Sequence, residues 1–175
     1  MNDGADSALR RTELSDEGGM RLALRLAAQA EEAGEVPVGA IVIHGQRVVA
    51  RACNQVEMLK DATAHAEMIA LTQASAAVGD WRLTDCTLIV TKEPCPMCAG
   101  AMVNARLGRL VYGAADARMG AAGSALSITD YPGMLHRVAV TGGVLGPECQ
   151  AQLQAFFRRR RQEEKDGKAH GETGQ

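Results

Sequence analysis

Apolar and polar residues follow different periodicities along this chain, and each stretch predicts a different element. Between residues 17 and 33, apolar side chains recur with approximate helical spacing up to Gly34, which predicts a first helix. The β-rich runs 38–44 and 48–53 flank Gly45-Gln46, a pattern typical of a hairpin. The ordered part of the chain is therefore expected to open with a helix followed by two antiparallel strands.

Two later stretches predict helices that begin close to polar or sulfur-bearing residues. Thr63 is expected to cap a helix that continues through Ile69 and Leu71 toward the core. The β-branched run 86–91 directly precedes Glu93-Pro94-Cys95. A strand is therefore expected to lead into a cysteine-bearing turn and helix.

The pattern in the second half of the chain completes an alternation of strands and helices. Residues 109–112 and 137–141 predict two short strands, and a terminal helix is expected from about residue 147. Leu153, Phe156 and Phe157 supply apolar side chains with which that helix can pack. Strands alternating with helices imply an α/β fold in three layers, with helices on both faces of a sheet of about five strands.

The two ends of the chain lack this patterning. Residues 1–16 are polar and acidic with little apolar periodicity, and residues 166–175 are mostly polar. Both segments are expected to be disordered. With 175 residues, 46% of them hydrophobic, the chain is long enough for one domain with a core and too short for two ordinary ones. We expect a single domain over residues 17–165.

Composition narrows the possible partners and the compartment. The formal net charge of −2 gives no overall attraction to nucleic acid, so any RNA binding must come from local clusters of Lys and Arg. Five cysteines, an odd number, with no charged-then-apolar leader, favour a cytoplasmic protein over a secreted disulfide scaffold. No apolar run approaches the roughly 18 to 20 residues needed to span a bilayer, so no membrane segment is expected.

The candidate chemistry lies in two short motifs. His65 precedes Glu67 by two positions, and Cys95 and Cys98 stand three apart, with Pro94 and Pro96 on either side of Cys95. In a first helical turn, cysteines with this spacing share a face and can hold one ion. One His and two Cys give three protein ligands, which leaves the fourth position of a catalytic zinc open for water. Glu67 is then placed to serve as general acid/base.

Each motif has a simpler interpretation when taken alone. Cys95 and Cys98 could form a redox pair or a chance C-x-x-C, and a lone His-x-Glu is weaker evidence still. Together with the prolines, however, they match the H-x-E and P-C-x-x-C signature of zinc deaminases that act on nucleobases. Histidines elsewhere show no ligand spacing, the other three cysteines are expected to be small buried hydrophobes, and Trp81 is expected to pack rather than stack on a base.

Longer segments carry a narrower resemblance, which covers about residues 17–165. Residues 63–71 (TAHAEMIAL), 91–102 (TKEPCPMCAGAM) and 112–124 (YGAADARMGAAGS) resemble the bacterial tRNA adenosine deaminases, within the cytidine deaminase-like superfamily. Residues 35–40 (EVPVGA) and Asn54 match the same family. The resemblance implies a three-layer α/β/α fold with a mixed sheet. It also implies a homodimer that binds one zinc ion per subunit and acts on the anticodon stem-loop of tRNA.

The resemblance also implies a reaction. Zinc held by His65, Cys95 and Cys98 is expected to lower the pKa of a bound water toward roughly 7, so that hydroxide attacks C6 of adenine. Glu67 then moves the proton to the ring nitrogen and on to the departing amine. Adenosine at the wobble position becomes inosine, with an arginine tRNA bearing an ACG anticodon as the expected substrate.

Several residues are expected to contact the substrate on the strength of the resemblance. Val38 and the backbone around Ala66 are expected to hold the base, and Asn54 to contact the flipped nucleotide. Turn statistics alone favour a strand-end Asn at position 54 and a turn or cap residue at Asp116. By similarity, Asp116 meets a ribose near the target base, where a carboxylate that accepts from a 2′-hydroxyl helps to distinguish RNA from DNA.

Basic residues provide the candidate RNA contacts. Arg158, Arg159, Arg160 and Arg161 follow one another on the predicted terminal helix, although Glu163 and Glu164 come soon after and are typical of an ordinary solvated helix end. Lys92 and Arg118 are further candidates. Lys92 and Ala115 stand where relatives often carry Leu and Arg, so the details of RNA contact are expected to differ here.

Two other functions compete with this interpretation. A zinc deaminase for a free base or nucleotide, such as guanine, cytosine or dCMP, would use the same zinc motif with another pocket. Asp116-Ala117-Arg118 and the basic terminal helix favour tRNA. A non-catalytic RNA-binding module stabilised by zinc is disfavoured, because Glu67 accompanies a three-ligand rather than a four-ligand site.

Overall fold

A five-stranded mixed sheet forms the centre of the protein in the computed structural model, which describes residues 14–171, with side chains placed for residues 14–166. The strands, in chain order, are β1 (Gly39–His44), β2 (Arg47–Cys53), β3 (Cys86–Lys92), β4 (Arg109–Ala114) and β5 (Ala139–Thr141). Their order across the sheet is β2-β1-β3-β4-β5. β1 runs antiparallel to β2 and β3, whereas β3, β4 and β5 run parallel to one another.

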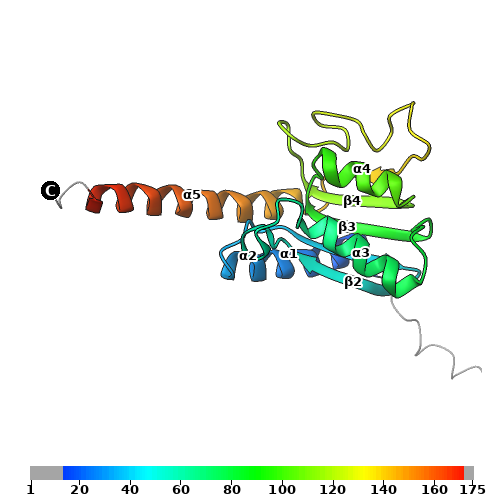
Figure 1. Ribbon diagram of the computed structural model, residues 1–175, viewed down its shortest axis with the longest axis horizontal. Coiled ribbons are helices and arrows are strands. Elements are labelled where there is room, and N and C mark those ends of the chain that lie inside the picture. The colour runs from blue at the N-terminus through cyan, green and yellow to red at the C-terminus, as the bar shows by residue number, and fades with distance from the viewer. Residues whose placement is uncertain (1–13, 172–175) are drawn as a thin grey trace, which may run out of the picture.

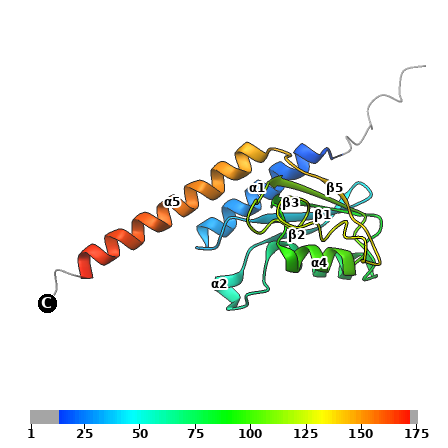
Figure 2. The ribbon, with the colours of Figure 1, turned by 90° about the horizontal axis from the view of Figure 1, so that it is seen from above.

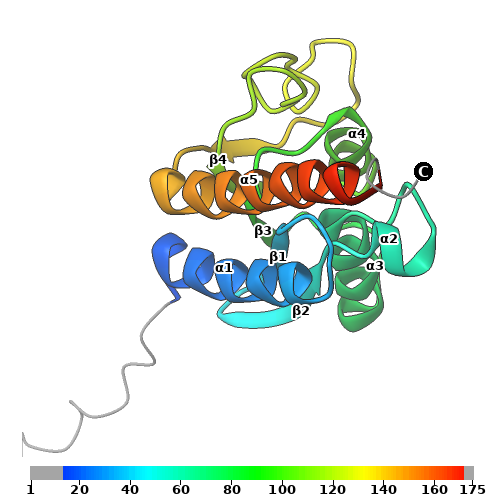
Figure 3. The same cartoon turned by 90° about the vertical axis from the view of Figure 1, so that its left-hand side faces the viewer.

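Helices cover both faces of this sheet. They are α1 (Asp16–Glu32), α2 (Val56–Leu59), α3 (Ala66–Val78), α4 (Pro96–Asn104) and α5 (Gly146–Gly171). α1 and the first turns of α5 lie on one face, and α3 and α4 lie on the other (Figures 1 and 2). Figure 3 shows the resulting layers end on, with α1 and α5 side by side. The predicted three-layer α/β/α fold with a mixed five-stranded sheet is confirmed.

The central strands are apolar because both of their faces are covered. Leu88, Ile89 and Val90 of β3 and Leu110 and Val111 of β4 are all buried, as expected for parallel strands between helical layers. The hairpin of β1 and β2 closes around Gly45-Gln46 as predicted. The core therefore lies on both sides of β3 and β4.

One end of the sheet collects residues from distant parts of the chain. Because β1 is antiparallel to β3, the start of β1 lies beside the end of β3, with Ala40 opposite Val90. At Gly39, α1 approaches so closely that a Cβ atom would lie 2.0 Å from the carbonyl oxygen of Ala23. Only glycine permits this contact. Because of this strand register, the same end of the sheet brings together Val38, Asn54 and the segment after Lys92.

The N-terminal boundary and one helix cap differ from the prediction. Ser15 caps α1 through a hydrogen bond from the N–H of Gly18 (3.1 Å), and Asp16 already belongs to the helix, so the ordered domain begins before residue 17. The predicted Thr63 cap is wrong: His65 is the N-cap residue of α3. Thr63 instead donates its N–H and hydroxyl to Asp61 (2.8 and 2.7 Å), a local turn that satisfies both donors. The expectation for residues 1–13 lies outside the described residues.

The C-terminal part also departs from the prediction. α5 continues past Lys165, where the tail was expected to begin, and ends at Gly171. β5 starts at Ala139 and is shorter than the predicted strand 137–141. Trp81 does not pack in the core: it is 52% exposed, with the Arg82 guanidinium 4.3 Å from its ring centroid. Among the described residues, no helix is both long and apolar enough to cross a membrane.

Candidate active site and metal centre

Two helix starts bring together the three predicted metal ligands. His65 is the N-cap of α3 and Cys95 is the N-cap of α4, which continues with Pro96 at its first position. Cys98 follows one turn later and is fully buried. Nδ1 of His65 lies 3.6 Å from Sγ of Cys95 and 3.5 Å from Sγ of Cys98. The predicted strand, turn and helix, which are β3, the turn after it and α4, therefore place both thiols beside His65.

The geometry of this trio fits zinc. The three ligand atoms all lie within 4.8 Å of one another. On a tetrahedral zinc ion, bond lengths of about 2.0–2.1 Å to nitrogen and about 2.3 Å to sulfur separate two such ligands by about 3.5 Å. The observed separations between nitrogen and sulfur match that value. Three ligands, rather than four, leave one coordination position for water or substrate, as in catalytic zinc sites.

The three ligand side chains are close enough to shift one another's pKa values. The hydrogen bond with the Cys98 thiol, joined by that with His65, lowers the pKa of Cys95 to about 3. The same interaction with Cys95, together with burial, raises the pKa of Cys98. The hydrogen bond with Cys95 raises the pKa of His65. These directions favour the thiolate form of Cys95, which is the form of cysteine that binds metal.

Glu67 lies on the first turn of α3 beside the trio. Its carboxyl group is buried, with the residue only 4% exposed, and burial raises its pKa. A carboxyl group with a raised pKa holds and releases a proton near neutral pH more readily than an exposed one. Ala66, directly before it, is fully buried at the first position of α3.

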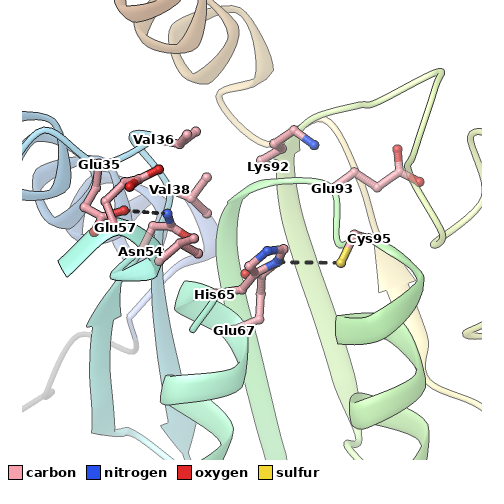
Figure 4. A pocket seen from close by; sticks show the side chains of 11 residues that line it. Glu35, Val36, Val38, Asn54, Glu57, His65, Glu67, Lys92, Glu93 and Cys95 are labelled. Atoms are coloured by element: carbon pink, nitrogen blue, oxygen red, sulfur yellow. Dashed lines mark hydrogen bonds between the residues drawn. The ribbon is translucent and has the colours of Figure 1, made fainter. Parts of the chain in front are cut away.

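A cavity of about 300 Å³ opens in front of these groups (Figure 4). Its size falls at the lower end of ligand pockets, which suits a single heterocyclic base. Its lining comes from the loop between α1 and β1, the residue after β2, helix α2, the end of β3 with the turn that follows it, and the starts of α3 and α4. The lining residues are Glu35, Val36, Val38, Asn54, Val56, Glu57, His65, Glu67, Lys92, Glu93 and Cys95.

Asn54 is held in this cavity by a buried carboxyl group that the sequence did not single out. Nδ2 of Asn54 donates to Oε2 of Glu35 (3.1 Å), and the backbone N–H of Met58 donates to Oε1 of the same side chain (2.7 Å). The backbone N–H of Asn54 donates to the carbonyl of Val38 (3.0 Å). Glu35 is 1% exposed, so its role is to fix Asn54 rather than to meet solvent. In the sequence, only its place in residues 35–40 (EVPVGA), which resemble the family, pointed to Glu35.

Asp116 lies beside the cavity and pairs with Lys92 at the end of β3. Its Oδ1 also accepts from the backbone N–H groups of Arg118 (2.9 Å) and Met119 (3.1 Å). Burial acts to raise the pKa of Asp116, but the Lys92 ion pair and these N–H groups outweigh it and bring the pKa to about 2. Asp116 is therefore an ionised acceptor whose position is fixed.

A second unpredicted carboxyl group, Glu93, organises the loop that carries Asp116. Its oxygens accept backbone N–H groups from Asp116 (2.9 Å), Ala122 (3.1 Å) and Ser124 (3.0 Å). Burial acts to raise its pKa, but the hydrogen bonds from Ser124 and the backbone outweigh it, so the pKa is lowered. The loop wraps so closely that a Cβ atom on Gly120 would lie 2.2 Å from Oε2 of Glu93.

The basic candidates for RNA contact separate into two groups. Arg118, Arg158 and Arg161 line one groove between the loop after β4 and α5, together with Gln150, Leu153, Gln154 and Phe157. Arg159 instead pairs with Glu31 at the end of α1, and Arg160 is exposed. Most of the predicted site residues therefore lie at the cavity or in this groove, whereas Arg159 and Arg160 line neither of them. The loop that contains Asp116 and Arg118 connects the two places.

Comparisons with known proteins agree with this geometry. The family described as MafB19-like deaminase matches residues 14–161. A tRNA-specific adenosine deaminase of Haemophilus influenzae is 46% identical over 165 residues, covering 94% of this chain and 95% of that protein. One of Bacillus subtilis is 43% identical over 150 residues, covering 86% and 93%. A structure from a study of A-to-I editing by tRNA:A34 deaminases at the wobble position superposes with a TM-score of 0.74 at 41% identity, covering 77% of this chain and 97% of that chain.

Proposed function

Because the chain belongs to the tRNA-specific adenosine deaminases, we propose that it converts the wobble adenosine of an arginine tRNA with an ACG anticodon to inosine. The observation that carries this proposal is the buried Glu67 beside His65, Cys95 and Cys98, at a cavity of the size of one base. Among deaminases of this superfamily, that combination performs hydrolytic removal of an exocyclic amine.

His65, Cys95 and Cys98 would hold one zinc ion per subunit, and the ion supplies a nucleophilic water at neutral pH. Glu67 accepts one proton of the attacking water and delivers it to N1 of adenine as the oxygen bonds to C6. It then takes the proton of the new C6 hydroxyl and passes it to the amine as the bond between C6 and that nitrogen breaks. Ammonia leaves, and the ring becomes that of hypoxanthine. The raised pKa of Glu67 suits a group that must both accept and return a proton.

The remaining lining residues position the nucleotide. Val38 packs against the base and the backbone at Ala66 lies beside it, while the Asn54 side chain, anchored by Glu35, reads one polar edge. Asp116 accepts from the ribose. The target base must leave the stack of bases in the anticodon loop to enter the cavity, as in other nucleobase deaminases.

We also propose that the enzyme acts in the cytoplasm as a homodimer. Large apolar side chains are exposed on α2 and in the loop after β4, among them Met58, Leu59, Met119 and Leu126, and a second copy would cover such groups. A molar mass near 37 kDa by light scattering at micromolar concentration is expected, about twice the 18.5 kDa of one chain. A mass of one chain under these conditions would rule the dimer out.

The decisive experiment measures inosine at the wobble adenosine of an in vitro transcribed arginine tRNA with an ACG anticodon, using zinc-loaded protein. Free adenosine, cytidine and guanine are assayed in parallel. Inosine in the tRNA alone supports the proposal. Turnover of a free base or nucleoside without any tRNA product would assign the same site to a small-molecule deaminase instead.

A further inference from the structure

Lys92 and Asp116 form an ion pair at the mouth of the cavity. Lys92 is the last residue of β3 and lines the cavity together with His65 and Glu67. Its side chain is 30% exposed and that of Asp116 is 18% exposed, so both remain accessible to an entering nucleotide. A lysine and an aspartate in contact here present a donor and an acceptor side by side.

The hydrogen bonds of Asp116 leave room for one more donor. An ionised carboxylate offers about four lone-pair positions and cannot donate. Oδ1 of Asp116 already accepts from the N–H groups of Arg118 and Met119, whereas Oδ2 accepts only from Lys92 among the described residues. The open acceptor position therefore lies on Oδ2, next to the Lys92 ammonium, which itself has three N–H donors.

We propose that Lys92 joins Asp116 in recognising the 2′-hydroxyl of the target nucleotide, so that Lys92 is a further specificity-determining residue of this enzyme. A hydroxyl group both donates and accepts. It donates to Oδ2 of Asp116 and accepts from Nζ of Lys92, and a deoxyribose satisfies neither. This inference rests on the proposed function, since it assumes that a nucleotide of RNA enters the cavity.

The pairing also argues against Lys92 as a simple phosphate contact. Its charge is largely offset by the Asp116 carboxylate, which accepts from it directly. A phosphate approaching Lys92 would meet the negative charge of Asp116 at nearly the same place. A neutral hydroxyl suffers no such repulsion. The two roles differ in their salt dependence, because only a phosphate contact releases counterions.

The test uses two anticodon stem-loops that differ in one atom. One carries adenosine at the target position and the other 2′-deoxyadenosine, and kcat/KM for inosine formation is measured with each. Wild-type protein is expected to favour the ribose substrate by at least about tenfold. Lys92→Met is expected to lower kcat/KM for the ribose substrate about tenfold and to leave that for the deoxyribose substrate within about twofold. Lys92→Arg, which keeps a cationic donor, is expected to retain most of the preference.

Controls separate the possible failures. Arg47→Met removes an exposed basic residue from the β1–β2 hairpin and should change neither substrate. Suppose instead that Lys92→Met lowers kcat/KM equally for both substrates, and that the slope of log kcat/KM against log salt concentration falls by about one. That result would identify a phosphate contact and overturn the proposal. An unchanged preference would overturn it as well. If wild-type protein forms inosine in neither stem-loop, the proposed function itself fails, and this inference with it.

Discussion

At the scale of single residues, burial of the Glu67 carboxyl beside the metal-binding trio determines its expected role. Glu67→Gln has nearly the same shape and is not one of the three ligands, so zinc should remain bound. It cannot carry a proton, and kcat for inosine formation should fall by at least about a thousandfold. Zinc content by elemental analysis and single-turnover rates test both statements. Glu17→Gln, on the exposed side of α1, is the matched control. Substantial activity of Glu67→Gln would refute the assignment.

Glu35 is expected to act through Asn54 and not on the substrate directly. Its two oxygens accept from Asn54 and from the backbone of Met58, and a glutamine at position 35 can satisfy only one of these donors. Glu35→Gln should therefore lower kcat/KM about tenfold. Because the loss passes through Asn54, the double variant with Asn54→Ala should be no worse than Asn54→Ala alone. Losses that multiply in this double-mutant cycle would show that Glu35 acts independently.

The functional residues found from sequence are those whose chemistry requires a fixed spacing. His65, Glu67, Cys95 and Cys98 stand at intervals that a helix start imposes on a metal site, and the structure brings them together. Glu35 and Glu93 have no such signature. Each is a buried carboxyl group whose partners come from other segments, up to 31 residues away for Glu93, and only the tertiary fold reveals those contacts.

At the scale of elements, Glu93 holds the loop after β4 against the end of β3. Glu93→Gln replaces an acceptor oxygen by an amide that faces backbone N–H donors, at a cost of about 2 kcal/mol. The melting temperature at pH 7 should fall by about 4–8 °C. A glutamate whose pKa is lowered on folding stabilises the folded protein fully at pH values above its ordinary pKa of about 4.3. This stabilisation is lost as the pH falls through the pKa of the folded state. The difference between variant and wild type should therefore shrink below pH 4.

Melting curves of both proteins between pH 3 and pH 8 make this measurement. Exposed Glu148→Gln at the start of α5 serves as a control for the loss of one carboxyl group. A difference between Glu93→Gln and wild type that stays constant across this range would mean that the charge of Glu93 contributes nothing to the loop.

Elements were predictable where periodicity was strong, and less so where local hydrogen bonds decided the boundary. The hairpin, β3 and α4 follow from apolar runs and from proline placement. The four-residue helix α2 was not expected, because it is too short to show a period; Lys60, its C-cap residue, lies in the left-handed region. The Thr63 cap failed for a related reason, since Asp61 captures both donors of Thr63.

At the scale of the whole molecule, the separation between cavity and groove predicts how tRNA is held. α5 extends beyond the sheet, and only its first turns pack on the body (Figure 1). The loop after β4 carries Asp116 at the cavity and, two residues later, Arg118 in the groove along α5. A stem-loop whose target base enters the cavity thus has a path for its backbone along the arginines of α5.

The positions of the arginines on α5 make this path testable. Arg158 and Arg161 lie on one helical face and line the groove, whereas Arg159 is engaged with Glu31. Arg158→Gln combined with Arg161→Gln should weaken binding of the full tRNA about tenfold and reduce the salt slope by about two, with little change in single-turnover chemistry at saturating tRNA. Arg159→Gln combined with Arg160→Gln removes the same charge and should have a clearly smaller effect. Anisotropy titrations between 50 and 300 mM KCl, about the range in which counterion release is measurable, compare the pairs. Equal losses from the two pairs would indicate bulk charge on α5 and not a defined groove.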